Sequence, residues 1–259
     1  MTSNGSLFDL TSRVALVTGG SRGLGLEIAM ALGRSGASVI ITARRVTWLS
    51  DAEAHLLDSG IACLALQCDI ADPDQVDATV AATVKQFGSI DILVNNAGIS
   101  WGAPIDAMPL AKWREVMETN VTGSFLMARA VGREMIKQGR GGSIVNVASI
   151  AGLVGTSSDV LDAVGYSASK GGLISLTRDL AVKWAVHNIR VNAVAPGFFD
   201  TRLSEGVLKH NRTRIEQSTP MGRIGRPGEL AGTIVYLAAP ASTYVTGQVI
   251  AVDGGMTAC

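Results

Sequence analysis

Two side chains in the second half of the chain are placed to act together on one ligand. Tyr166 and Lys170 lie four positions apart, so a helix through this stretch would project both from the same face. A tyrosine can give a proton to a developing alkoxide if its normally high pKa is brought down toward the working pH. A neighbouring ammonium lowers that pKa because its positive charge stabilises the phenolate. The pair is therefore a candidate acid/base site.

Two polar residues that precede this pair extend the candidate site. Ser149 can donate a hydrogen bond to a substrate oxygen and so stabilise the negative charge that develops there. Asn120 lies in the run Glu-Thr-Asn-Val-Thr-Gly. A buried tyrosine or asparagine is often only a satisfied polar group of the core, and a lysine often lies on a solvated face. The presence of all four residues in this order favours the catalytic interpretation.

A glycine-rich turn near the start of the sequence is a candidate phosphate site. The run Thr-Gly-Gly-Ser-Arg-Gly-Leu-Gly at residues 18–25 follows a β-branched segment and precedes a helical pattern through Ile28 and Leu32. Glycine allows backbone amides to approach a diphosphate at the N-terminus of a helix, where the helix dipole also favours negative charge. An ordinary tight turn is the alternative. We expect a dinucleotide to contact Gly19, Ser21, Arg22, Gly23, Leu24 and Gly25.

Seven short β-branched segments alternate with longer amphipathic ones and must position these residues. They cover residues 14–18, 39–42, 61–66, 90–95, 143–148, 189–194 and 248–252. Segments such as Ser-Ile-Val-Asn-Val are apolar on both faces, which is typical of a parallel sheet covered by helices on both sides. Asp72, Pro73 and Gln75 match the start of a helix with a capping box. The sequence therefore predicts a doubly wound α/β fold in a single domain over residues 1–259.

The composition limits the classes of partner. Of 259 residues, 47% are hydrophobic, which supplies a large core, and acidic and basic residues balance at 22 each. This balance argues against a broad surface for nucleic acid or an anionic membrane. No apolar run reaches the roughly 18 residues of a membrane span and no signal-peptide pattern is present, so we expect a cytoplasmic protein. Cys63, Cys68 and Cys259 lack metal-ligand spacing, and we expect no metal site.

The order of these motifs resembles the short-chain dehydrogenase/reductase family over residues 10–256. The resemblance rests on the Gly-x-x-x-Gly-x-Gly spacing of the turn, Asn-Asn-Ala-Gly at 95–98, Asn120, Ser149, Tyr-Ser-Ala-Ser-Lys at 166–170 and Pro-Gly at 196–197. It implies a Rossmann fold with a seven-stranded parallel sheet, and hydride transfer between a nicotinamide cofactor and a carbonyl or alcohol. Tyr166 would be the acid/base, Lys170 would tune it, and Ser149 would bind the carbonyl.

The same resemblance implies further roles. Lys170, beside Tyr166, would also hold the nicotinamide ribose hydroxyls, and Asn120 would hold a water that links Lys170 to solvent as a proton relay. Further cofactor contacts are implied. Asp69 and Ile70 would contact the adenine, and Phe199 and Thr201 would contact the nicotinamide carboxamide. The loop after the fourth predicted strand would contribute Asn96, Ala97 and Gly98.

The end of the second predicted strand indicates which nicotinamide cofactor is preferred. An acidic residue at this position would bind the adenosine ribose of NAD, but none occurs before Asp51. Arg44, Arg45 and the turn residue Arg22 instead offer donors for a 2′-phosphate. We therefore predict a preference for NADP(H), with NAD(H) as the alternative. Adjacent arginines on a solvated surface are the competing explanation.

The substrate stays open at this level. Ser149 and Tyr166 lie 17 positions apart, which is longer than the family's common interval, so an insertion within residues 153–165 should border the substrate. Its polar residues suit a polar substrate and are Ser157, Ser158, Asp159 and Asp162. Other residues indicate an apolar wall and are Trp101, Leu153, Phe198 and Leu203. Local segments are similar to gluconate 5-dehydrogenase-like and to 3-oxoacyl-carrier-protein reductase-like members of the family.

Further expectations concern the protein as a whole. Residues 198–223 are predicted to form a mobile substrate lid. The stretch after Tyr166 holds more apolar residues than one helix face requires, which predicts a homo-oligomer, a tetramer as in most single-domain members of the family. Two other functions compete. One is a sugar or sugar-acid dehydrogenase that uses the same residues, and the other is a dinucleotide-binding regulator without catalysis, because a fold does not fix a function.

Overall fold

A seven-stranded parallel sheet runs through the protein, whose computed structural model describes residues 7–258. The strand order is β3-β2-β1-β4-β5-β6-β7. The strands are β1 (Val14–Thr18), β2 (Ser38–Ala43), β3 (Cys63–Gln67), β4 (Ile92–Asn95), β5 (Gly142–Val147), β6 (Ile189–Pro196) and β7 (Val249–Val252). All seven predicted strands are confirmed, with ends that move by at most two residues.

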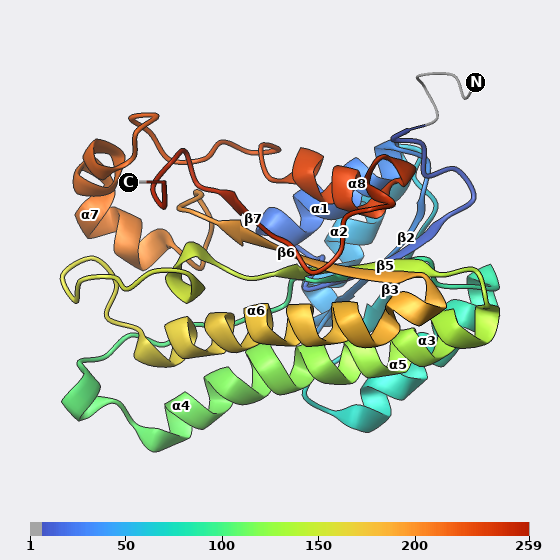
Figure 1. Ribbon diagram of the computed structural model, residues 1–259, viewed down its shortest axis with the longest axis horizontal. Coiled ribbons are helices and arrows are strands. Elements are labelled where there is room, and N and C mark those ends of the chain that lie inside the picture. The colour runs from blue at the N-terminus through green and yellow to red at the C-terminus, as the bar shows by residue number, and fades with distance from the viewer. Residues whose placement is uncertain (1–6, 259) are drawn as a thin grey trace.

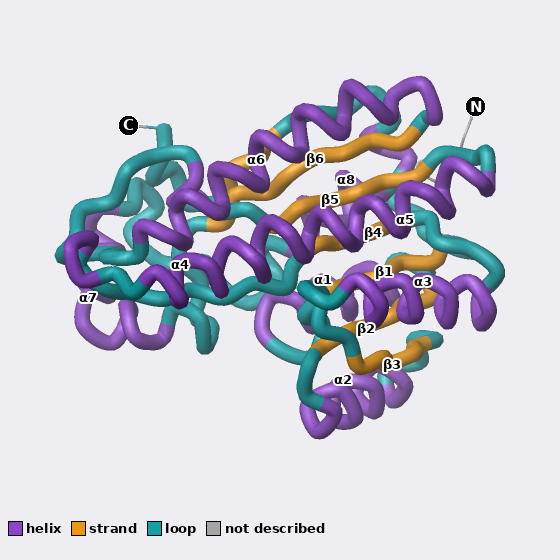
Figure 2. The backbone as a smooth tube through the Cα atoms, turned by 90° about the horizontal axis from the view of Figure 1, so that it is seen from below, coloured by secondary structure: helices purple, strands orange, loops and turns teal. Residues whose placement is uncertain are grey.

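Helices cover both faces of this sheet (Figure 1). One face carries α1 (Gly23–Arg34), α2 (Val46–Asp58) and α8 (Ala231–Ala238). The other carries α3 (Pro73–Phe87), α5 (Ser124–Gln138) and α6 (Val164–Trp184), which lie side by side in Figure 2. Two helices lie beyond the carboxyl ends of the strands, and these are α4 (Leu110–Met117) and α7 (Glu205–Ser218). The predicted doubly wound fold is therefore confirmed.

The burial of β1 shows why its residues are apolar on both faces. Ala15 and Val17 belong to the hydrophobic cluster under α1, α2 and α8. Val14 and Leu16, which alternate with them, belong to the cluster under α3, α5 and α6. Since successive strand residues point to opposite faces, a strand covered on both sides has no position left for a polar residue.

The predicted start of α3 is confirmed, with one difference in its capping. Asp72 accepts hydrogen bonds from the amides of Asp74 and Gln75 at 3.0 and 3.2 Å. A capping box would bring the Gln75 side chain to the Asp72 amide, but that amide already donates to the Asp69 carbonyl at 3.0 Å. The Gln75 amide oxygen instead accepts from the Asp69 amide at 2.9 Å. The cap therefore also fixes the loop that follows β3.

The predicted lid region contains α7 and a small hydrophobic cluster of its own. Leu208, Ile215 and Ile224 form that cluster, and Phe198 and Val160 pack against it. Within residues 7–258, none of the helices combines the length and the hydrophobicity that a bilayer crossing requires.

Candidate functional site

A cleft opens at the carboxyl ends of the strands, where β1 lies between β2 and β4. The chain passes from β1 to β2 on one side and later returns to β4 on the other, and crevices at such switch points are where doubly wound folds bind ligands. Most of the predicted cofactor residues line this cleft, namely Gly19, Ser21, Arg22, Gly23, Leu24, Gly25, Arg44, Arg45, Asp69, Ile70, Asn96, Ala97, Gly98 and Thr201.

The glycine-rich turn has the geometry of a phosphate cradle. A Cβ on Gly25 would lie 2.2 Å from the Gly19 carbonyl oxygen, so the turn closes only with glycine there. Gly23 adopts φ +53°, and a Cβ on it would meet nothing nearer than Thr201, at 3.9 Å. The helix α1 begins at Gly23 without a side-chain cap, which leaves its first amides free for an anion. These residues fit the diphosphate of a dinucleotide.

Hydrogen bonds join this turn to the end of β4. The Thr18 hydroxyl accepts from the amides of Asn96 and Ala97, both at 3.0 Å. The Asn96 side chain donates to the carbonyls of Thr18 and Gly19 at 2.9 and 3.2 Å. Asn96 therefore contributes by holding the turn, and Thr18 is a partner that the sequence analysis missed. The signal available in the sequence was the position of Thr18 as the last residue of the first predicted strand.

The predicted arginines lie at one end of the cleft, around an aromatic ring that the sequence analysis did not single out. The guanidinium carbons of Arg22 and Arg45 lie 3.6 and 4.3 Å from the centroid of the Trp48 ring. Arg44 is half-exposed, with a terminal nitrogen 3.9 Å from an Asp69 carboxylate oxygen. Burial and the positive charges of Arg202 and Arg45 lower the pKa of Arg22. This end of the cleft is therefore rich in positive charge.

Three of the four predicted catalytic residues come together where β5 ends. Ser149 begins a short 3₁₀ turn (Ile150–Gly152), and its hydroxyl accepts from the Ala151 amide at 3.2 Å. Tyr166 and Lys170 lie on successive turns at the start of α6. The Lys170 ammonium donates to the Val147 carbonyl at 2.7 Å and lies 5.6 Å from the centroid of the Tyr166 ring.

The electrostatics of this group differ from the expectation in one respect. Burial lowers the pKa of Lys170 from 10.5 to about 8, because its ammonium is removed from water. Burial also raises the pKa of Tyr166, and a hydrogen bond with Ser149 acts in the opposite direction. The spacing of Tyr166 and Lys170 in the sequence had led to the expectation that Lys170 lowers the pKa of Tyr166. In this structure desolvation dominates, and the pKa of Tyr166 lies above its ordinary value.

Asn120 lies in a π-helical turn (Glu118–Gly123) between α4 and α5. Its side-chain amide accepts from the Ile99 amide at 2.8 Å and donates to the Ile99 carbonyl at 2.9 Å. It also donates to the Ser169 hydroxyl, at 2.9 Å, and Ser169 is the neighbour of Lys170 on α6. Asn120 therefore ties the loop after β4 to α6. The residue types gave no signal for these partners, because Ile99 contributes only its backbone amide and carbonyl and a serine such as Ser169 is common in helices.

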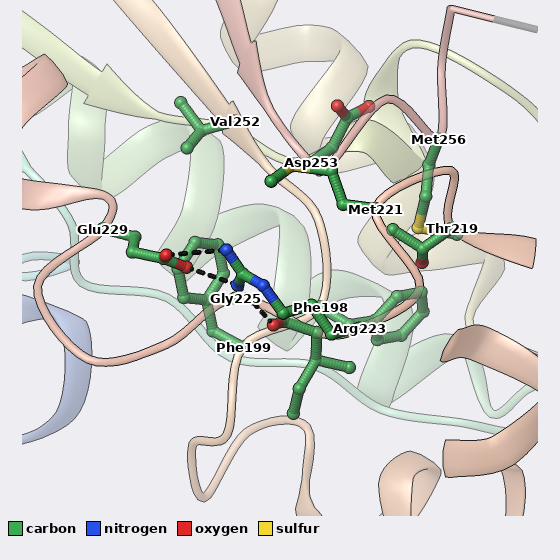
Figure 3. Close-up of a pocket in the computed structure, with 12 residues that line it drawn as sticks. Phe198, Phe199, Thr219, Met221, Arg223, Gly225, Glu229, Val252, Asp253 and Met256 are labelled. Carbon is green, nitrogen blue, oxygen red and sulfur yellow. Dashed lines mark hydrogen bonds and ion pairs between the residues drawn. The ribbon is translucent and has the colours of Figure 1, made fainter. Parts of the chain in front are cut away.

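Phe199, like Tyr166 and Lys170, is not among the residues that line the cleft. Its buried ring contributes to a second pocket, between the segment after β6 and the segment after β7 (Figure 3). The same pocket contains the bidentate ion pair of Arg223 and Glu229, with both nitrogen–oxygen distances at 2.8 Å. Hydrogen bonds from Arg223 and from the Arg226 amide lower the pKa of Glu229 to about 2. The Glu229 carboxylate therefore holds the loop between Arg223 and Glu229 through these bonds.

The insertion before α6 is anchored on both sides. The Asp162 carbonyl accepts from the Ala103 amide at 2.8 Å, in the loop after β4. Asp159 pairs with Arg214 on α7, and Ser157 donates to Asp159 at 2.5 Å. The described part of the chain contains no group of three or more His, Cys, Asp or Glu side chains that could hold a metal ion.

Comparisons with known proteins agree with this geometry. The family model described as enoyl-(acyl carrier protein) reductase matches residues 19–257. A 3-oxoacyl-[acyl-carrier-protein] reductase of Synechocystis is 41% identical over 95% of this chain and 98% of its own. A gluconate 5-dehydrogenase of Gluconobacter oxydans is 38% identical over 98% of both chains.

Solved structures match equally well. A short-chain type dehydrogenase/reductase from Mycobacterium marinum has a TM-score of 0.94 and 40% identity, covering 98% of each chain. A gluconate 5-dehydrogenase from Burkholderia cenocepacia, in complex with NADP and tartrate, has a TM-score of 0.94 and 36% identity, covering 99% of this chain and 100% of its own. The chain therefore belongs to the short-chain dehydrogenase/reductase family and is an oxidoreductase that interconverts alcohols and carbonyls.

Proposed function

We propose that this oxidoreductase uses NADP(H) and that Ser149, Tyr166, Lys170 and Asn120 form its catalytic site. The observation that carries the proposal is the group of Ser149, Tyr166 and Lys170, which reaches a cleft that has a glycine cradle and an arginine-rich end. The Lys170 ammonium lies 3.5 Å from the position of a Cβ on Gly98, a residue that lines the cleft. When bound, the nicotinamide cofactor supplies the hydride chemistry. A regulator without catalysis would have no need for a buried lysine beside a tyrosine.

The side chains of the site divide the remaining chemistry. The Ser149 hydroxyl accepts from the Ala151 amide and is hydrogen-bonded to Tyr166, and we assign to it the stabilisation of the negative charge that develops on the substrate carbonyl oxygen. Tyr166 gives its phenolic proton to the same oxygen. The Lys170 ammonium stabilises the phenolate that results. Asn120 holds α6 in register with the loop after β4, and we assign it the proton relay as well.

The preference for NADP(H) is supported by the charge of the cleft. No carboxylate follows β2 where the adenosine ribose would lie, and Arg22, Arg44 and Arg45 line that end. Guanidinium groups bind phosphate through several charge-assisted hydrogen bonds. A relative that was solved with NADP, the gluconate 5-dehydrogenase from Burkholderia cenocepacia, adds support.

The surroundings of the site favour a substrate with an apolar body. Of the two aspartates of the insertion, Asp159 is engaged by Arg214 and Ser157. Large apolar side chains stay exposed nearby, with Trp101 at 44%, Leu153 at 40% and Leu203 at 52%. We therefore propose a ketone with a hydrophobic body, with residues 198–223 as the lid over it. A sugar acid is the second candidate, because a gluconate 5-dehydrogenase is among the relatives.

We also propose a tetramer in the cytoplasm. Much of the apolar surface of α6 that suggested an oligomer is used within the subunit, since Leu173 and Leu180 are buried. Val182 remains 79% exposed, and Phe125 on α5 is 40% exposed. The strand β7 is an edge of the described sheet, and proteins usually cover such edges. Cys63 and Cys68 are free thiols, in keeping with a reducing compartment.

The first prediction tests the reaction and the role of Tyr166. The wild-type protein should oxidise NADPH with at least one member of a panel of cyclic ketones, oxoacyl thioesters and keto-sugar acids, followed by absorbance. Tyr166→Phe keeps the ring and removes the proton donor, so kcat should fall by about 10² to 10⁴-fold while the Kd for NADPH changes little. Near-normal turnover by the variant would remove Tyr166 from its role, and cofactor binding without turnover on the whole panel would favour the regulator.

The second prediction concerns the buried charge of Lys170. Its pKa is depressed in the folded protein to about 8 from 10.5, so burial penalises folding below pH 8 and the penalty disappears as the pH rises toward 10.5. The free energy of unfolding of the wild type, minus that of Lys170→Met, should increase by up to about 3 kcal/mol between pH 7.5 and 10.5. Urea titrations at each pH measure this difference. Lys85→Met, at an exposed lysine of α3, should give a flat difference; an equally flat result for Lys170→Met contradicts the prediction.

The third prediction tests the cofactor preference at Arg44. Arg44→Gln removes charge-assisted hydrogen bonds, so kcat/KM for NADPH should fall by about 10 to 100-fold. The decrease should be nearer 10-fold, because Arg22 and Arg45 still bind the phosphate. Arg44→Asp adds repulsion and should shift the preference toward NADH. Measurements with both cofactors and one substrate give the ratio. A wild type that already prefers NADH, or a ratio that neither variant moves, contradicts the assignment.

The fourth prediction concerns assembly. Light scattering at micromolar concentration should give a mass about four times the 26.9 kDa of the subunit. Val182→Glu places a charge on the exposed face of α6 and should lower that mass without unfolding the subunit, as far-UV circular dichroism would show. A wild-type mass equal to that of one subunit would overturn the proposal.

A further inference from the structure

Trp48 is the centre of a cluster formed by three arginines from separate parts of the chain. Arg22 comes from the glycine-rich turn, Arg45 directly precedes α2, and Arg202 lies between β6 and α7. Their guanidinium carbons lie 3.6, 4.3 and 5.5 Å from the centroid of the Trp48 ring. The ring therefore connects the cofactor cleft to the first residues of the proposed lid.

The positive charge of this cluster is not neutralised within the described chain. Across residues 7–258, no carboxylate oxygen lies within 4.0 Å of a guanidinium nitrogen of Arg22, Arg45 or Arg202. Arg44, by contrast, has Asp69 at 3.9 Å. Burial lowers the pKa of Arg22, and the positive charges of Arg202 and Arg45 lower it further. A dianion placed among them would relieve this repulsion.

The cluster is also open to a ligand. Arg22, Arg45, Trp48 and Arg202 all line the dinucleotide cleft, at the end that follows β2. Arg202 is exposed, and its neighbour Thr201 is the nearest group to the position that a Cβ on Gly23 would take. The start of the lid therefore lies against the glycine-rich turn, within reach of a ligand that occupies both.

We infer that Trp48 and Arg202 complete a 2′-phosphate site that is shared between the cofactor cleft and the lid. Trp48 is a positioning residue, because its face orients the guanidinium groups of Arg22 and Arg45. Arg202 is a specificity-determining residue that brings a further charge to the phosphate from the lid. Binding of the 2′-phosphate then draws residues 198–204 against the cleft. The inference rests on the proposed preference for NADP(H) and assigns the lid a part in it.

A matched pair of nucleotides tests the site without turnover. Adenosine 2′,5′-bisphosphate and adenosine 5′-monophosphate differ only in the 2′-phosphate, and calorimetry on the full chain gives a Kd for each. The discrimination ratio is the Kd of the monophosphate divided by that of the bisphosphate. Arg202→Gln should lower this ratio by about 10-fold, the effect of one charge-assisted hydrogen bond, and leave the Kd of the monophosphate unchanged. Lys209→Gln removes a positive charge from α7, outside the cleft, and should not change the ratio.

The role of Trp48 is tested by two substitutions. Trp48→Leu removes the aromatic face and should lower the discrimination ratio, whereas Trp48→Phe keeps a face and should restore most of it. A purely structural role would instead weaken both nucleotides together and lower the thermal midpoint. Hydrogen exchange in residues 198–204 of the wild type should slow with the bisphosphate and not with the monophosphate, and this difference should disappear in Arg202→Gln.

The outcomes separate this inference from the proposed function. A wild-type ratio near one would overturn the NADP(H) preference, and this inference with it. A large wild-type ratio that survives both Arg202→Gln and Trp48→Leu would overturn the inference alone. If Arg202→Gln weakened the binding of both nucleotides equally, the Arg202 guanidinium would contact the 5′-phosphate that they share. That result would overturn the assignment of Arg202 to the 2′-phosphate.

Discussion

The parallel pairing of every strand is the constraint on which the site depends. The carboxyl ends of parallel strands all lie on the same side of the sheet. The residues that follow β1, β2, β3, β4 and β5 therefore meet there, although they are far apart in the sequence. The side chains of Thr18 and Asn96 then join the turns after β1 and β4 by four hydrogen bonds. The shape of the glycine cradle is thus set by the neighbouring strand as well as by its own residues.

The helix α6, which carries Tyr166 and Lys170, is positioned by buried polar groups rather than by packing alone. Asn95 on β4 donates to Asn146 on β5 at 3.0 Å, and Asn146 donates to Thr177 on α6 at 2.8 Å. Asn120 adds a contact to Ser169 near the other end of the helix. Because buried polar groups are costly without partners, these bonds specify one register of α6. That register places Lys170 against the Val147 carbonyl and beside Tyr166.

The insertion and the lid form one structure above this site. Val160 of the insertion packs with Phe198 on the hydrophobic cluster of α7, and Asp159 pairs with Arg214. The insertion also leads directly into α6, the helix that carries Tyr166. Arg202 connects the beginning of the same lid segment to Trp48 and the cofactor cleft. Direct contacts therefore connect the insertion with α7, and the segment before α7 with the cleft.

The sequence by itself determined the seven strands, the glycine-rich turn and the four catalytic candidates, because each leaves a local pattern. Burial on both faces makes the strands apolar throughout, and the tight turn requires glycine at fixed spacing. It also determined the absence of an acidic residue directly after β2.

The tertiary structure alone decided which polar groups meet. It brought three arginines to Trp48, gave Asn120 its partners Ile99 and Ser169, and paired Asp159 with Arg214. It also decided that the ring of Phe199 lies in another pocket and that desolvation raises the pKa of Tyr166. These facts depend on the packing of segments distant in sequence and on exclusion of water, and neither leaves a pattern in the order of residues.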